Sequence, residues 1–185
     1  MLNMFQNVIQ RFKNECLALG YEVLLEADVC GWLFHLLLTQ SEVNPQQIHL
    51  DTRVLDADGR FDIVMGSLRT RANGRPCIEP QLIVEVKIFP RIGFTEQQHR
   101  VHYEHVLNDD LPKLGGLNPD IGLRAALIVD GRGYLEGTYQ GHNRRDYLIK
   151  KRNQIARGIH VFIISLADGH WQIEHKAPET APNSG

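Results

Sequence analysis

The chain has 185 residues, of which 43% are hydrophobic and 23% charged, as is ordinary for one globular domain with a substantial core. Its formal net charge of −2 excludes a global positive field, so nucleic-acid binding would have to rest on local clusters of cations. The three cysteines lack zinc-knuckle or disulfide spacing, and no segment reads as a signal peptide or membrane span. We therefore expect reduced thiols in one cytoplasmic domain over residues 1–176, with a disordered tail over 177–185.

Two helices are predicted at the start of the chain. Apolar residues between positions 5 and 19 recur at helical spacing, and Gly20 marks the end of that helix. A second helix is predicted over residues 24–38. Its Glu26 shares the apolar, inward face, whereas Asp28 falls off that face and is expected to be solvated.

The next region predicts an antiparallel hairpin. Residues 46–54 have a strand pattern, residues 56–59 are a turn signal, and a second strand over 60–65 carries the single carboxylate Asp62. Residues 69–80, which contain Asn-Gly and Arg-Pro pairs, are predicted to be a connecting loop.

Residues 82–89 form a β-branched apolar run interrupted only by Glu85 and Lys87. Side chains alternate along a strand, so both charges point to the same face. Burying an unpaired carboxylate or ammonium costs several kcal/mol, so such groups need partners or a metal. The alternative is a surface pair on an edge strand, but the run is typical of a central strand buried on both faces.

The second half of the chain alternates helices and strands. Thr95 is predicted to cap a helix that continues to about Leu111. The elements expected after it are a strand over 123–129, a basic helix over 143–157, and a hairpin of strands 159–166 and 171–176. This order of hairpins and helical crossovers predicts a mixed sheet flanked by helices.

Asp62, followed by Glu85-Val86-Lys87 on the next strand, resembles the motif of the PD-(D/E)XK nuclease superfamily. Glu26 matches the acid that this family often takes from the preceding helix, although Phe61 replaces the motif's proline. The helix after the third strand also lacks the Gln-x-x-x-Tyr signature of one exonuclease branch. The resemblance spans about residues 22–130 and implies an α/β, restriction-endonuclease-like fold. In that fold an αβββαβ core forms a central mixed sheet flanked by helices, and the C-terminal helix and hairpin would be additions.

The resemblance also implies a metal-dependent endonuclease acting on DNA, with RNA not excluded. Asp62, Glu85 and Glu26 would hold Mg²⁺ or Mn²⁺, Lys87 would position and help deprotonate water, and Gln98 would border the site. A one-domain chain with such a site is similar to the compact nucleases of mobile-element, repair or defence systems, and that biological setting is an analogy only. The alternatives are a non-catalytic binding module that retains the fold, and a small hydrolase acting on another phosphorylated substrate.

A dense basic cluster in the helix over 143–157 suits a phosphate backbone. Its cations are Arg144, Arg145, Lys150, Lys151, Arg152 and Arg157. The alternative is a solvated helix face. His99, His102 and His105 are each three residues apart, so their side chains point in successively different directions around the helix axis. Surface positions are therefore expected rather than a zinc site. Cutting both DNA strands with one site per chain favours a homodimer, and a role as accessory protein of a larger nucleic-acid-processing system is left open.

Overall fold

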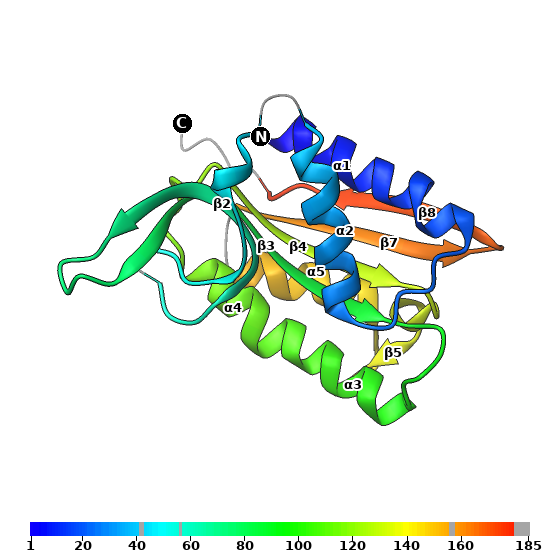
Figure 1. Cartoon of the computed structure of the whole chain (residues 1–185). Helices are drawn as coiled ribbons and strands as arrows, with labels where there is room; N and C mark the ends of the chain where they lie inside the picture. Colours follow the sequence, from blue (N-terminus) through cyan, green and yellow to red (C-terminus); the bar gives the residue numbers. More distant parts are fainter. Residues whose placement is uncertain (41–42, 56, 156–157, 180–185) are drawn as a thin grey trace, which may run out of the picture.

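The structure is a computed structural model that describes residues 1–40, 43–55, 57–155 and 158–179. Within these residues, six strands form one mixed sheet in the order β1-β2-β3-β4-β7-β8, with helices on both faces (Figure 1). The strands are β1 (Ile48–Thr52), β2 (Phe61–Thr70), β3 (Pro76–Phe89), β4 (Leu123–Asp130), β7 (Ile159–Ala167) and β8 (His170–Lys176). β3, β4 and β7 pair in parallel, and the other pairs are antiparallel.

The helices are α1 (Leu2–Glu15), α2 (Glu26–Leu38), α3 (Glu96–His105), α4 (Leu111–Gly115) and α5 (Arg144–Ile155). A two-stranded ribbon of β5 (Thr138–Tyr139) and β6 (His142–Asn143) precedes α5. The order α2-β1-β2-β3-α3-β4 is the expected αβββαβ order, and α5, β7 and β8 are the expected additions. In the described part of the chain, no helix is both long and apolar enough to cross a bilayer.

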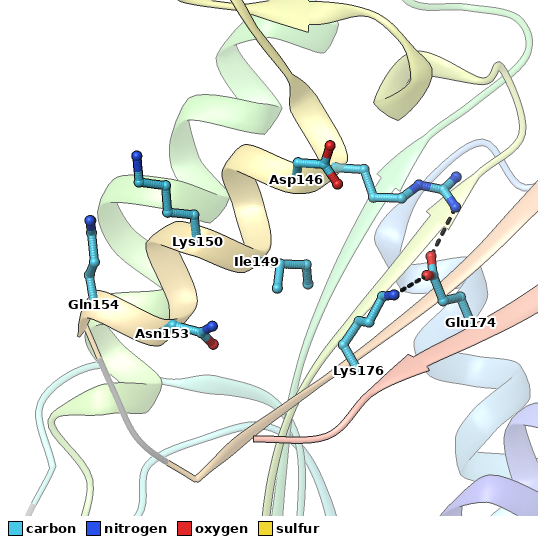
Figure 2. A pocket seen from close by; sticks show the side chains of 8 residues that line it. Asp146, Ile149, Lys150, Asn153, Gln154, Glu174 and Lys176 are labelled. Atoms are coloured by element: carbon cyan, nitrogen blue, oxygen red, sulfur yellow. Dashed lines mark hydrogen bonds and ion pairs between the residues drawn. The ribbon is translucent and has the colours of Figure 1, made fainter. Parts of the chain in front are cut away.

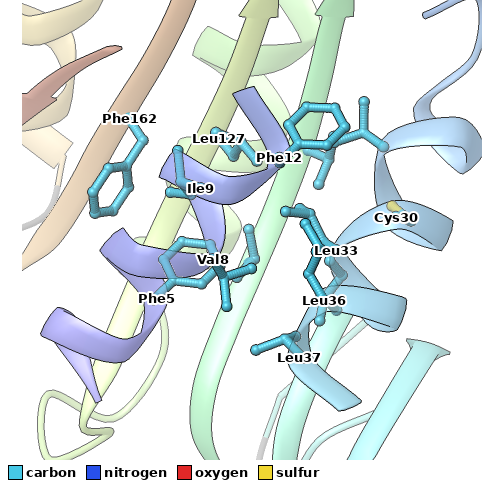
Figure 3. Close-up of a cluster of buried hydrophobic side chains, with 14 of the residues drawn as sticks. Phe5, Val8, Ile9, Phe12, Cys30, Leu33, Leu36, Leu37, Leu127 and Phe162 are labelled. Carbon is cyan, nitrogen blue, oxygen red and sulfur yellow. The ribbon is translucent and has the colours of Figure 1, made fainter. Parts of the chain in front are cut away.

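The two faces of the sheet are covered by different helices. α1 and α2 pack on one face, where Phe5, Ile9 and Phe12 meet Leu33, Leu36 and Leu37 over the strand residues Leu127 and Phe162 (Figure 3). α3, α4 and α5 cover the other face. Both parallel connections, β3 to β4 and β4 to β7, pass through helices on this second face, as parallel pairing requires.

The loop predicted over 69–80 is wrong, because β2 and β3 continue into a long hairpin there. Their ladder runs out to the pair Thr70 and Pro76. The register shifts by a bulge after Met65, and Gly66 then faces Pro80 on β3. Proline has no N–H to donate to a regular ladder, so it is tolerated at such a bulge. A Cβ on Gly66 would collide with the carbonyl of Glu79, so the close approach of β2 and β3 at this bulge requires glycine.

The helix predicted from Thr95 to about Leu111 contains a wider turn. Thr95 caps it as expected, but residues Val106–Asp110 form a π-helix between α3 and α4. Pro112 explains the irregularity, because it has no N–H and its ring crowds the carbonyl four residues earlier. The π-turn changes which side chains of α4 face the sheet, and such turns are frequent at functional sites.

Candidate active site

β2 and β3 separate at the end of their ladder where Asp62 lies. The last ladder pair is Ile63 with Val84, and two residues further along β3 the backbone N–H of Val86 donates to Asp62 Oδ2 at 2.7 Å. A side-chain carboxylate thus takes the place of a backbone acceptor. This bond fixes Asp62 against β3, next to the residues on either side of Val86, which are Glu85 and Lys87.

Glu85 is 6% exposed and lies on the face covered by α3 and α4. Its carboxylate is paired with the ammonium of Lys113 from α4. Burial raises the pKa of Glu85 to about 8, the negative charge of Asp62 adds to this effect, and Lys113 offsets it only in part. Asp62 therefore lies near enough to Glu85 for its negative charge to disfavour ionisation of Glu85.

Lys87 lies between two carboxylates. Its Nζ is 3.0 Å from Glu26 Oε1 and 3.4 Å from Asp110 Oδ2. Burial raises the pKa of both acids. Burial alone would lower the pKa of Lys87, but Asp110 and Glu26 outweigh it, so the Lys87 pKa is raised and the ammonium stays charged.

Local capping determines how Glu26 reaches this position. Asp28, which was expected to be solvated, accepts the backbone N–H groups of Leu24 and Leu25 at 3.0 and 2.9 Å. These bonds satisfy amides ahead of the first turn, so that α2 begins at Glu26. The helix approaches from the opposite face of the sheet, and Glu26 meets Lys87 beyond the end of the β2–β3 ladder.

The structure brings together four of the five predicted catalytic residues, Glu26, Asp62, Glu85 and Lys87. Gln98 has another position. It is exposed, and its side chain accepts the Thr95 N–H at 2.7 Å in a capping box, so it stabilises the start of α3.

Sequence reasoning missed two residues of this cluster, Asp110 and Lys113. Their side chains come from the π-helix and from the short α4 that follows it. The available signal was Pro112 inside an otherwise helical segment that also carries acids and a lysine. A proline there indicates a distorted turn, but not the direction in which its side chains point.

The donor set fits a hard divalent cation, because Glu26, Asp62, Glu85 and Asp110 offer only oxygen ligands. Glu26 Oε1 is buried and lies 3.0 Å from Lys87 Nζ and 3.6 Å from His102 Nδ1. However, no group of three histidine, cysteine, aspartate or glutamate side chains in the described ranges is arranged to hold a metal ion. Lys87 and Lys113 supply the positive charge in this structure.

The predicted basic cluster of α5 lies only partly at the surface. Arg152 is 2% exposed and donates to the carbonyls of Ile159 and Ala177, both at 2.9 Å. It therefore joins α5 to the sheet and cannot reach an external phosphate. Arg157 lies outside the described residues, and so do residues 180–185 of the predicted tail.

Two further cations of α5 are already compensated. Arg144 lies 3.6 Å from the ring centroid of Tyr134 and 3.3 Å from Glu96. Arg145 pairs with Glu136 and, at 2.9 Å, with Glu174 on β8. Of the predicted contacts, Lys150 is exposed and Lys151 half-buried. Figure 2 shows Lys150 pointing away from β8, whereas Lys176 turns toward Glu174.

The expectation of surface histidines on α3 is wrong for His99. This residue is fully buried, and its ring lies against Phe89, Phe94 and Tyr134. Burial lowers its pKa, so the imidazole is held neutral. Both ring nitrogens lack a hydrogen-bond partner, so His99 acts as an aromatic core residue.

No family model matches the chain, and no curated protein matches it significantly. Among solved structures, it is similar to Pyrococcus furiosus SfsA in complex with Ca²⁺, at 11% identity and a TM-score of 0.31. The match covers 82% of this chain and 63% of that one, so the chain spans less than two thirds of the length of SfsA. A likeness this distant does not indicate which side chains act.

Proposed function

We propose that this chain is a metal-dependent nuclease of the PD-(D/E)XK type that hydrolyses phosphodiester bonds in DNA. The supporting observation is the meeting of Asp62 with Glu85 and Lys87 where β2 and β3 separate, joined by Glu26 from α2. Charges this deeply placed are costly to the fold. A catalytic site gives a physical reason for their presence.

In this proposal Asp62, Glu85 and Glu26 hold Mg²⁺ or Mn²⁺. Such a cation would supply positive charge at the reacting phosphate and lower the pKa of water. Lys87 offers a hydrogen bond and a positive charge to the scissile phosphate or to the attacking water. Asp110 and Glu26 raise the pKa of Lys87, so in the metal-free arrangement the lysine is a charged donor that can position water.

A second candidate is a non-catalytic binding module that keeps the fold. One observation favours it: Lys113 neutralises Glu85 from within the protein, where a nuclease would need a metal. In that case the two lysines and the surrounding acids would form a buried ion-pair network with no chemical role.

DNA is the proposed partner, with RNA as a second polymer to test. Lys150 and Lys151 on α5 are the predicted phosphate contacts that remain after Arg152 is assigned to the core. A homodimer would supply the second site that a double-strand break needs. The proposal places the protein in a reducing, cytoplasmic setting, supported by three buried cysteines that are all free.

The deciding experiment is a cleavage assay with plasmid DNA, single-stranded DNA and RNA. Each substrate is incubated with the protein and Mg²⁺, Mn²⁺ or EDTA, and Asp62→Asn is run in parallel. Metal-dependent cleavage that disappears in the variant supports the nuclease. Binding of DNA with no cleavage under any metal would support the binding module, and equal cleavage by wild type and variant would point to a contaminant.

A further inference from the structure

The side chain of Lys113 follows a defined path into the site. It leaves α4 and ends with its Nζ 4.3 Å from the centroid of the Phe61 ring, in contact with Glu85 and the carbonyl of Arg60. A Cβ built on Gly59 would lie 3.3 Å from Lys113 Cε, and Gly59 also has a φ of +85° that favours glycine. The aliphatic part of the Lys113 side chain therefore packs closely against the turn at Gly59, where a larger residue would crowd it.

The ammonium of Lys113 contacts Oε1 of Glu85, one of the two oxygens through which Glu85 would bind a cation. Glu85 is almost fully buried, so its ionised form needs a positive partner. Lys87 is engaged on the other side of the cluster, between Glu26 and Asp110. Lys113 in turn is 26% exposed along its side chain, so it can swing outward without unfolding α4.

We infer that Lys113 is a positioning residue that holds Glu85 while no divalent cation is present and must give way when one binds. Lys113 thereby sets the affinity of the site for metal. The inference rests on the proposed function and deepens it, since it concerns the same carboxylates.

The expected effect of removing Lys113 has a definite sign. Its positive charge repels the two charges of a divalent cation. Lys113 also occupies one oxygen of Glu85 that a cation would use. A neutral residue at position 113 removes both the repulsion and this competition, so it tightens metal binding.

The test measures binding of Mn²⁺ and Mg²⁺ to the full chain by titration calorimetry and by thermal shift, without nucleic acid. Lys113→Met and Lys113→Gln remove the charge, and Gln keeps a donor for the Arg60 carbonyl. Lys113→Arg keeps the charge. Lys176→Met removes a lysine that is paired with Glu174 at 2.5 Å outside the site, and serves as the matched control.

We expect both neutral variants to bind Mn²⁺ roughly tenfold tighter than wild type or more, with Lys113→Arg and Lys176→Met close to wild type. If Lys113→Met does not fold, Lys113→Gln decides the result. Equal affinity in wild type and neutral variants would overturn the inference while leaving the metal site intact. No binding in any variant would overturn the metal site, and the proposed function with it.

Discussion

Asp62 Oδ2 accepts the backbone N–H of Val86 at 2.7 Å, so one carboxylate joins the two strands that carry the site. The bond leaves Oδ1 of Asp62 outside this contact. It also holds the negative charge near Glu85, whose pKa it helps to raise. Structural and chemical roles of Asp62 can therefore be separated by a substitution that keeps the acceptor and removes the charge.

Asp62→Asn should keep the fold and lose metal-dependent cleavage. The amide oxygen can still accept the Val86 N–H, while loss of the charge relieves repulsion with Glu85 and should raise the melting temperature. We expect cleavage to fall by at least about 100-fold, measured as plasmid nicking, and Glu85→Gln to lose cleavage to the same extent. Glu15→Gln, which alters an exposed pair on α1, is the control. Full activity in Asp62→Asn would remove the site assignment.

Local patterns predicted most of this fold. Period-two and period-3.6 hydrophobicity located the central strands and α1, and the Thr95 cap located the start of α3. The β2–β3 hairpin was missed because Pro76 and Pro80 weaken the strand signal. The structure accommodates both, one at the end of the ladder and the other opposite Gly66 at the bulge.

The candidate site was predicted in part. Asp62, Glu85 and Lys87 could be found because charges in buried strands break an apolar pattern. Asp110 and Lys113 could not, since their direction depends on a π-turn that no periodicity encodes. The burial of Arg152 was also hidden, because whether a helical arginine faces water or the sheet depends on packing that composition does not reveal.

Stability should fall as pH rises from 6.5 to 8.5. The folded-state pKa of Glu85 is about 8 against an ordinary 4.5, so over this range the folded chain holds a proton that the unfolded chain has lost. Stability is then lost with rising pH until about pH 8, at up to about 1.4 kcal/mol per pH unit from this group. Urea denaturation at each pH without metal measures the slope. Glu85→Gln should flatten it.

The opposing effect of His160 is largest below that range, and the comparison with Glu85→Gln cancels what remains of it above pH 6.5. Burial lowers the pKa of His160 to about 4 against an ordinary 6.5, so this group removes stability as pH falls through that interval. A wild-type slope identical to that of Glu85→Gln above pH 6.5 would show that Glu85 is not the group responsible.

Mg²⁺ and Mn²⁺ should raise the melting temperature of the wild type. A ligand that binds only the native state stabilises it by about 2.7 kcal/mol at one hundred times its dissociation constant, which amounts to several degrees for a chain of this size. The measurement is differential scanning calorimetry with metal and after EDTA, with Asp62→Asn as the control. An unchanged melting temperature at millimolar metal would favour the binding module.

Lys87→Ala should abolish turnover while metal affinity stays the same or improves. The lysine competes electrostatically with the cation, and without it Glu26 and Asp110 face each other across the site. Without metal the variant should be destabilised by about 3 kcal/mol, and metal should restore much of this. Lys87→Ala with Asp110→Asn should recover stability without turnover. Activity near wild type in either variant would exclude Lys87 from catalysis.

DNA binding through α5 should depend on Lys150 and Lys151 and not on Arg152. Replacing both lysines with glutamine should lower the slope of log affinity against log salt by up to about 1.8 on duplex DNA, since each phosphate contact contributes about 0.9. Arg152→Gln should instead lower stability and leave the slope unchanged, because its guanidinium bonds to Ile159 and Ala177 inside the protein. Fluorescence anisotropy at several salt concentrations measures both. A wild-type slope in the double variant would show that α5 is a solvated face. The next candidates would then be Arg69, Arg71 and Arg75 on the β2–β3 hairpin, of which Arg69 pairs with Glu79 and Arg71 donates to the carbonyl of Val54.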